Sequence, residues 1–220
     1  MATALVTGAG RGIGLAFCRA FAQRGDTVIA ACRMPTAELS SLGVRIERGV
    51  DVTSDSAVSS LAQRLAGTKI HLLVNNAGIL TREGLDDLDL EKVRHQIEVN
   101  SIGPLRVTRA LLPLLAPQAK VAIITSLMGS MGDNGSGGYY GYRMSKAAVN
   151  AGGVSLARDL APRGIAVALL HPGYVRSDMT NQQGTVDPDD SVRGMLACID
   201  ALTLETSGQF HRYTGELLPW

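Results

Sequence analysis

Aromatic residues are scarce in this sequence, which has three Phe, five Tyr and one Trp among 220 residues. The core is therefore expected to be mainly aliphatic. Cysteine is also rare: the three cysteines are far apart and form no CxxC pair, which argues against a disulfide framework and against a zinc site. The four histidines lack metal-ligand spacing, so we expect no metal site.

An excess of charge of either sign is also missing, because 21 basic residues face 20 acidic residues and the net charge is +1. Proteins that bind nucleic acid or a membrane surface carry a basic face, so we expect neither partner. No apolar run reaches the ~20 residues of a membrane span, and the first residues do not fit a signal peptide. The composition predicts a reduced, cytoplasmic protein.

Glycine, in contrast, is abundant, with 25 of the 220 residues. Short continuous apolar runs, each typical of a buried strand, alternate with segments of helical periodicity. This alternation predicts a doubly wound, mostly parallel α/β sheet of the Rossmann type, in one domain over residues 1–220. The expected strands are 3–7, 28–31, 44–46, 71–74, 121–125 and 165–170, with a closing strand and tail at 208–220, and the expected helices are 15–23, 54–65, most of 85–115, 142–160 and 192–202.

The first expected strand runs directly into a glycine-rich turn, TGAGRGIG at residues 7–14, and a helix follows. Glycines allow a tight turn and let the backbone approach a pyrophosphate, and a helix N-terminus offers free N–H groups and a positive dipole end. The turn therefore predicts a dinucleotide site, with a plain strand-to-helix turn as the alternative.

The spacing of this turn, G-x-x-x-G-x-G, together with the later NNAG at residues 75–78, resembles the short-chain dehydrogenase/reductase family. The resemblance covers essentially the whole chain. It implies an oxidoreductase that moves a hydride between a nicotinamide cofactor and a small molecule. The residues given family roles below are those that match the family's motifs.

Arginine, not an acid, stands where the second expected strand ends, in AACR at residues 30–33. An acidic residue about 20 residues beyond the glycine loop would bind the ribose 2′-OH of NAD. Arg33 and Arg11 are instead suited to a 2′-phosphate, so we predict NADPH over NADH, with a solvated Arg33 as the alternative. Together with the resemblance, this predicts cofactor contacts from Gly8, Arg11, Gly12, Ile13, Gly14, Arg33, Asp51, Val52, Asn75, Ala77, Gly78, Tyr142, Lys146, Pro172, Gly173, Val175 and Ser177.

A tyrosine and a lysine four residues apart, in YRMSK at residues 142–146, open an expected helix. Side chains at this spacing lie on one helical face. Reduction of a carbonyl needs an acid close to the oxygen, and a neighbouring lysine, with the positive nicotinamide ring, is expected to lower the pKa of Tyr142. Tyr139 and Tyr140 have no lysine at that spacing, so Tyr142 and Lys146 are the predicted catalytic pair.

The resemblance implies two more catalytic residues. Ser126, at the end of the strand 121–125, resembles the serine that hydrogen-bonds the substrate oxygen, with Ser130 as its competitor. Asn100, in EVNS at residues 98–101, resembles the asparagine of the proton relay. PGYVRSDM at residues 172–179 resembles a family segment in which the Val175 backbone and the Ser177 hydroxyl contact the cofactor.

The substrate is expected to be an uncharged ketone or aldehyde, because the candidate walls are mostly apolar. These walls are Met128, Tyr139, Tyr140, Tyr174, Met179 and Trp220, with Leu80 and Gly132 nearby. The stretch 133–143 and the final LPW resemble the C-factor and sniffer-type carbonyl reductase branch.

The preferred hypothesis is therefore an NADPH-dependent carbonyl reductase. The alternatives are a cofactor-binding signalling protein of the C-factor type and an NAD-linked alcohol dehydrogenase. The small residues of the helix 146–160 could also pack on another helix. Because the matching family helix pairs across a two-fold axis, we expect a homodimer or homotetramer, with packing on the sheet as the alternative.

Overall fold

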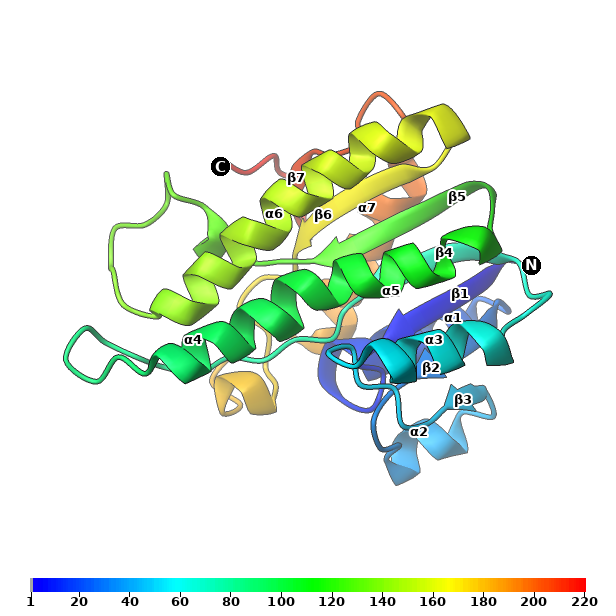
Figure 1. The fold of residues 1–220 in the computed structure, drawn as a ribbon, viewed down its shortest axis with the longest axis horizontal. Coiled ribbons are helices and arrows are strands. Elements are labelled where there is room, and N and C mark those ends of the chain that lie inside the picture. The colour runs from blue at the N-terminus through cyan, green and yellow to red at the C-terminus, as the bar shows by residue number, and fades with distance from the viewer. Residues whose placement is uncertain (1) are drawn as a thin grey trace.

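A single seven-stranded sheet forms the centre of the computed structural model, which describes residues 2–220. The strand order is β3-β2-β1-β4-β5-β6-β7 and each neighbouring pair is parallel. The strands are β1 (Thr3–Thr7), β2 (Thr27–Ala31), β3 (Arg45–Glu47), β4 (Ile70–Asn75), β5 (Leu115–Ile124), β6 (Ala166–His171) and β7 (Phe210–Arg212). The predicted doubly wound fold is confirmed (Figure 1).

Helices cover both faces of this sheet, as parallel strands with apolar side chains on both faces require. One core cluster packs α3, α5 and α6 on the sheet, and the other packs α1, α2 and α7 on its opposite face. The helices are α1 (Gly12–Gln23), α2 (Ala37–Ser41), α3 (Asp55–Arg64), α4 (Leu90–Ile97), α5 (Gly103–Leu111), α6 (Tyr140–Leu160) and α7 (Pro188–Ala201). The core is mainly aliphatic, and Phe17 and Phe21 stack within it at 5.8 Å between ring centroids.

The stretch 85–115, expected to be mostly helical, forms two helices in the structure. Asp89 caps the start of α4 by accepting from the N–H groups of Glu91 and Lys92. A π-helical turn at Glu98–Ile102 then separates α4 from α5. Helix α5 has Pro104 in its first turn, where the missing N–H of proline is tolerated. After a short 3-10 turn at Leu112–Leu114, the chain enters β5 at Leu115, six residues before the predicted strand.

The two halves of the sheet diverge between β1 and β4. From β1 the chain adds β2 and β3 on one side, and β4 begins the series that continues through β5, β6 and β7 on the other. The loops after β1 and β4 therefore leave the sheet in opposite directions and open a crevice at the carboxyl ends of these strands. This crevice holds the candidate site.

Candidate functional site

The turn after β1 lies tightly against the end of β4. The Asn76 amide Nδ2 donates to the carbonyls of Thr7 (2.9 Å) and Gly8 (3.3 Å), and the Thr7 hydroxyl accepts from the Asn76 N–H at 3.0 Å. A Cβ on Gly14 would lie 2.3 Å from the Gly8 carbonyl oxygen, so only glycine fits there. The glycine turn is thus held in place by its own packing.

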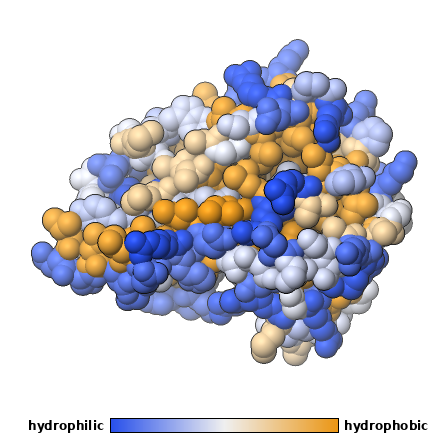
Figure 2. Space-filling view, in the orientation of Figure 1, coloured by the Kyte–Doolittle hydropathy of each residue, from blue (hydrophilic) through white to orange (hydrophobic). Residues whose placement is uncertain are grey.

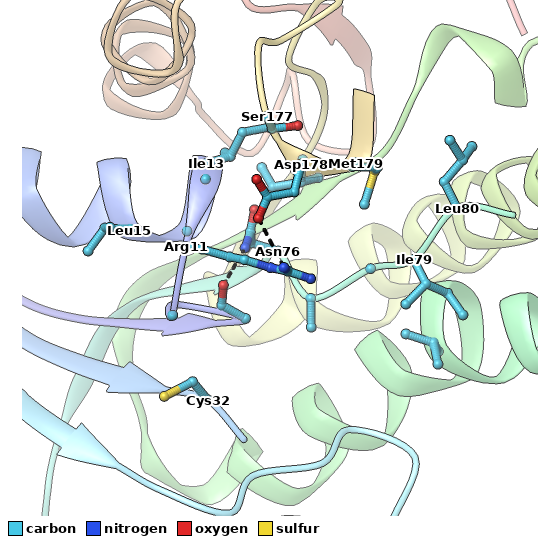
Figure 3. Close-up of a pocket in the computed structure, with 18 of the residues that line it drawn as sticks. Arg11, Ile13, Leu15, Cys32, Asn76, Ile79, Leu80, Ser177, Asp178 and Met179 are labelled. Atoms are coloured by element: carbon cyan, nitrogen blue, oxygen red, sulfur yellow. Dashed lines mark hydrogen bonds and ion pairs between the residues drawn. The ribbon is translucent and has the colours of Figure 1, made fainter. Parts of the chain in front are cut away.

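A cavity of about 690 Å³ opens above this turn. Its volume lies in the range of small-molecule and cofactor sites. Figure 3 shows its lining from the glycine turn, the β4 end and the 177–179 segment. Of the predicted cofactor residues, it is lined by Gly8, Arg11, Gly12, Ile13, Gly14, Arg33, Asp51, Val52, Ala77, Gly78, Tyr142, Lys146, Pro172 and Ser177.

Asn75, also predicted to contact the cofactor, lies outside this lining. It is 2% exposed, and its Nδ2 donates to the Thr108 hydroxyl of α5 at 3.0 Å. Because side chains alternate along a strand, Asn75 faces the helical layer and its neighbour Asn76 faces the cavity. The NNAG motif marks the right turn, but strand alternation decides which asparagine lines the cavity.

Gly173 and Val175 also lie outside the lining, beneath the cavity. Gly173 has a φ of +83°, and a Cβ there would meet the Tyr213 ring at 2.9 Å. Val175 is buried, and its carbonyl accepts from the Thr180 hydroxyl at 2.7 Å. Both residues shape the 172–180 segment, which brings Pro172, Ser177, Asp178 and Met179 to the cavity.

Tyr142 and Lys146 both reach the cavity from the first turns of α6. The Lys146 ammonium donates to the Ile124 carbonyl at the end of β5, at 2.9 Å. Burial lowers the pKa of Lys146 to about 8 and raises the pKa of Tyr142 to about 12. In the protein without cofactor, the pKa of Tyr142 is therefore raised by burial and not lowered as expected. The Ser126 side chain lowers this pKa, but by less than burial raises it.

Ser126 and Ser130 differ in what their side chains contact. Ser126 follows β5 and accepts from the Met128 N–H at 3.2 Å, and its side chain is close enough to Tyr142 to act on the tyrosine pKa. The Ser130 hydroxyl is buried and accepts from the Asp133 N–H at 3.1 Å. The contact with Tyr142 favours Ser126 over Ser130.

Asn100 lies in the π-helical turn and ties the loop after β4 to α6. Its Oδ1 accepts from the Ile79 N–H at 2.8 Å, and its Nδ2 donates to the Ile79 carbonyl at 2.9 Å and the Ser145 hydroxyl at 3.0 Å. A Cβ on Gly78 would lie 3.2 Å from the Asn100 Oδ1 and 3.8 Å from the Lys146 Nζ. Asn100 and Lys146 thus meet at one glycine. Such π-helical turns are frequent at functional sites. No pattern in the sequence predicted this one.

Arg33 and Arg11, both predicted to bind the 2′-phosphate, have different surroundings in the structure. Arg33 lines the cavity just beyond β2. There, hydrogen bonds from Thr53 and the positive charge of Arg33 lower the pKa of Asp51. The Arg11 side chain instead extends across the cavity, and its guanidinium donates to Asp178 at 3.0 Å (Figure 3).

Most of the predicted substrate walls lie outside the cavity lining. Met179 lines it, together with Ile79 and Leu80, while Met128, Tyr139, Tyr140, Tyr174 and Trp220 do not. Trp220 stacks on Phe210 at 5.5 Å and lines a second hollow of about 440 Å³ between α6 and the chain end. The Trp220 ring therefore packs on β7, where Phe210 is its apolar partner.

Two negative findings concern residues 2–220. No group of three His, Cys, Asp or Glu side chains is placed to hold a metal ion. None of the helices described is long and apolar enough to cross a membrane.

Comparison with known proteins agrees with this geometry. A family model for the short chain dehydrogenases matches residues 2–187. The 1-hydroxy-2-glutathionyl-2-methyl-3-butene dehydrogenase of Rhodococcus sp. (strain AD45) is 44% identical over 100% of both chains. C-signal of Myxococcus xanthus is 46% identical over 69% of this chain and 93% of its own. The NADPH-bound carbonyl reductase from chicken fatty liver superposes with a TM-score of 0.92 at 31% identity, covering 99% of this chain and 98% of its own.

The burial of Lys146 leads to a prediction about the stability of the protein. We expect Lys146→Met to raise the free energy of unfolding at pH 7 by about 1–3 kcal/mol, because the charged form is penalised by burial. The unfolded chain binds the proton up to pH 10.5 and the folded chain up to about 8, so wild-type stability rises relative to the variant between these values. The difference in the free energy of unfolding between the wild type and Lys146→Met should close at pH 10.5.

Urea denaturation of both proteins from pH 7 to pH 10.5 measures this difference. Lys92→Met is the matched control, because the Lys92 side chain is 57% exposed. A constant difference between Lys146→Met and the wild type across this pH range would contradict the prediction.

Proposed function

Because this chain belongs to the short-chain dehydrogenase family, we propose that it is an NADPH-dependent carbonyl reductase that acts on uncharged ketones or aldehydes. The observation that carries the proposal is that Tyr142 and Lys146 line the cavity together, with the Lys146 Nζ 5.6 Å from the Tyr142 ring centroid, while Lys146 and the Asn100 side chain both approach Gly78. Family membership makes the protein an oxidoreductase; the substrate, the cofactor and the role of each residue are proposals.

The cavity fits a dinucleotide phosphate. Gly8 and Gly12 have φ values of +66° and +54°, which bring backbone rather than side chains to the cavity surface. Arg33 supplies a guanidinium where a 2′-phosphate would need one. The chicken carbonyl reductase, which has the same fold, is described as NADPH-bound. These observations support NADP over NAD.

The chemistry assigns a separate task to each polar side chain. The bound nicotinamide supplies the hydride. Tyr142, which burial keeps protonated at neutral pH, donates its proton to the oxygen of the reduced substrate. Ser126 orients that oxygen. Lys146 passes a proton back to Tyr142, and Asn100 holds a water through which solvent supplies that proton to Lys146.

The substrate proposal follows from the apolar residues at the cavity. Ile79, Leu80 and Met179 line it beside Tyr142, and these side chains favour an uncharged carbonyl compound. The Rhodococcus relative supports a second candidate, an alcohol dehydrogenase working in the oxidising direction, because its name describes oxidation of a hydroxy compound and its identity of 44% extends over the whole chain. The similarity to C-signal supports a third, a signalling role.

The central experiment measures NADPH consumption with a panel of ketones and aldehydes. We expect turnover by the wild type and a loss of about 10²–10⁴-fold in kcat for Tyr142→Phe, which removes the proton donor and keeps the ring. Tyr140→Phe is the control, since Tyr140 is exposed and lies outside the cavity lining.

Tight NADPH binding without turnover of any compound would favour the signalling role. Faster turnover of alcohols with NAD would favour the dehydrogenase. Equal activity of wild type and Tyr142→Phe would overturn the assignment of Tyr142.

The cofactor preference is tested at Arg33. We expect Arg33→Ala to weaken NADPH binding about tenfold or more, because a charge-assisted contact to a doubly charged group is lost. NADH binding, measured by the same fluorescence titration, should change little. An equal loss for both cofactors would show that Arg33 does not read the 2′-phosphate.

We further propose that the protein is a homo-oligomer paired through α5 and α6. Apolar side chains gather over these helices in Figure 2. Ile102 at the π-helical turn, Leu105 on α5 and Met144 on α6 are 40%, 39% and 51% exposed. Gly153 does not belong to this surface, because a Cβ there would meet Leu169 of β6 at 2.4 Å, so part of the small-residue pattern serves packing on the sheet.

Light scattering should give at least twice the monomer mass of 23.1 kDa, and Leu105→Glu should reduce it. A wild-type monomer would disprove the pairing.

A further inference from the structure

An ion pair spans the cavity between its two lips. Arg11, in the glycine turn, donates to the Asp178 Oδ2 at 3.0 Å, and both residues line the cavity. Their side chains are 73% and 59% exposed. In Figure 3 the Arg11 side chain crosses the cavity in front of Asn76 to reach Asp178. The pair therefore connects the β1–α1 turn with the segment that follows β6.

The segment around Asp178 is held in a constrained conformation. The other carboxylate oxygen of Asp178 accepts from the Gln182 Nε2 at 3.0 Å. Asn181 and Gln182 have φ values of +51° and +62°, which are costly for residues other than glycine. Such strain is frequent at ligand clamps and switch regions.

The electrostatics at this position oppose an anionic ligand. A carboxylate at the cavity lip repels a phosphate, and Arg11 neutralises it only while the two are paired. An exposed ion pair is weak, whereas a phosphate offers a guanidinium more charge and more acceptor oxygens. A dinucleotide phosphate can therefore displace Asp178 from Arg11.

We propose that the Arg11–Asp178 ion pair is an electrostatic latch across the cofactor cleft. Binding of the dinucleotide opens this latch, because its phosphates replace Asp178 as the partner of Arg11. Asp178 is then a positioning residue that weakens cofactor binding, and thereby favours release. The inference rests on the proposed function, because it takes the ligand to be NADP.

The test compares NADP⁺ binding by calorimetry in wild type and Asp178→Asn, which keeps the side-chain shape and removes the charge. We expect the Kd of Asp178→Asn to be about two- to fivefold lower at low salt, with the difference shrinking as ionic strength rises. Asp190→Asn is the matched control: Asp190 pairs with Arg193 on α7 at 2.7 Å, with 58% of its side chain exposed. Its Kd should equal that of the wild type.

A double-mutant cycle separates the latch from simple repulsion. In an Arg11→Gln background, Asp178→Asn should give a clearly smaller gain in affinity, because only the direct repulsion between Asp178 and the phosphates remains. The same gain in that background would mean that Asp178 acts on the phosphates directly, and a higher Kd for Asp178→Asn would mean that the pair clamps the bound cofactor. Either result overturns the latch.

Hydrogen exchange of the protein without nucleotide tests the latch apart from the proposed function. Asp178→Asn and Arg11→Gln should both speed amide exchange over residues 177–183, and Asp190→Asn should not. If the wild type binds no NADP⁺, the proposed function fails while this measurement still decides on the latch. Unchanged exchange in both variants would disprove it.

Discussion

The interaction on which the site depends is the contact between the glycine turn and the end of β4. The Asn76 amide holds the carbonyls of Thr7 and Gly8, and this contact lies where the sheet diverges. It fixes the floor of the cavity, because the backbone there cannot retreat without breaking partly buried hydrogen bonds. The loop that leaves this contact carries Gly78 and Ile79 toward the helices.

From that loop, hydrogen bonds continue to the catalytic helix. Asn100 holds both backbone polar groups of Ile79 and reaches Ser145 of α6, and Lys146 is anchored on the Ile124 carbonyl of β5. The floor of the cavity and the Tyr142–Lys146 pair are therefore joined by one path of buried and partly buried contacts. In the proposed function, this path positions a cofactor on the floor relative to Tyr142.

Charge is arranged differently at the two ends of the cavity. At the inner wall, burial lowers the pKa of Lys146, which costs stability at neutral pH. Burial also raises the pKa of Tyr142, which keeps the tyrosine protonated. At the mouth, the charges of Arg11 and Asp178 are exposed and paired. In the proposed reaction the inner groups carry the proton, and in the proposed latch the outer pair exchanges partners.

The sequence alone determined the fold class, the glycine turn and the Tyr142–Lys146 pair. Each rests on a local pattern: apolar runs alternating with helices, glycine spacing, or two side chains one helical turn apart. The shared family, including its C-signal and carbonyl reductase relatives, followed from the same motifs and is confirmed.

Tertiary structure decided what depends on neighbours distant in sequence. Strand alternation turned Asn76 rather than Asn75 toward the cavity. The π-helical turn formed where Asn100 found Ile79 and Ser145, and the Arg11 side chain reached toward Asp178, which is 167 residues away in the chain. Trp220 packed on Phe210 and not at the cavity. In each case a side chain had several possible partners, and only the folded chain selected one.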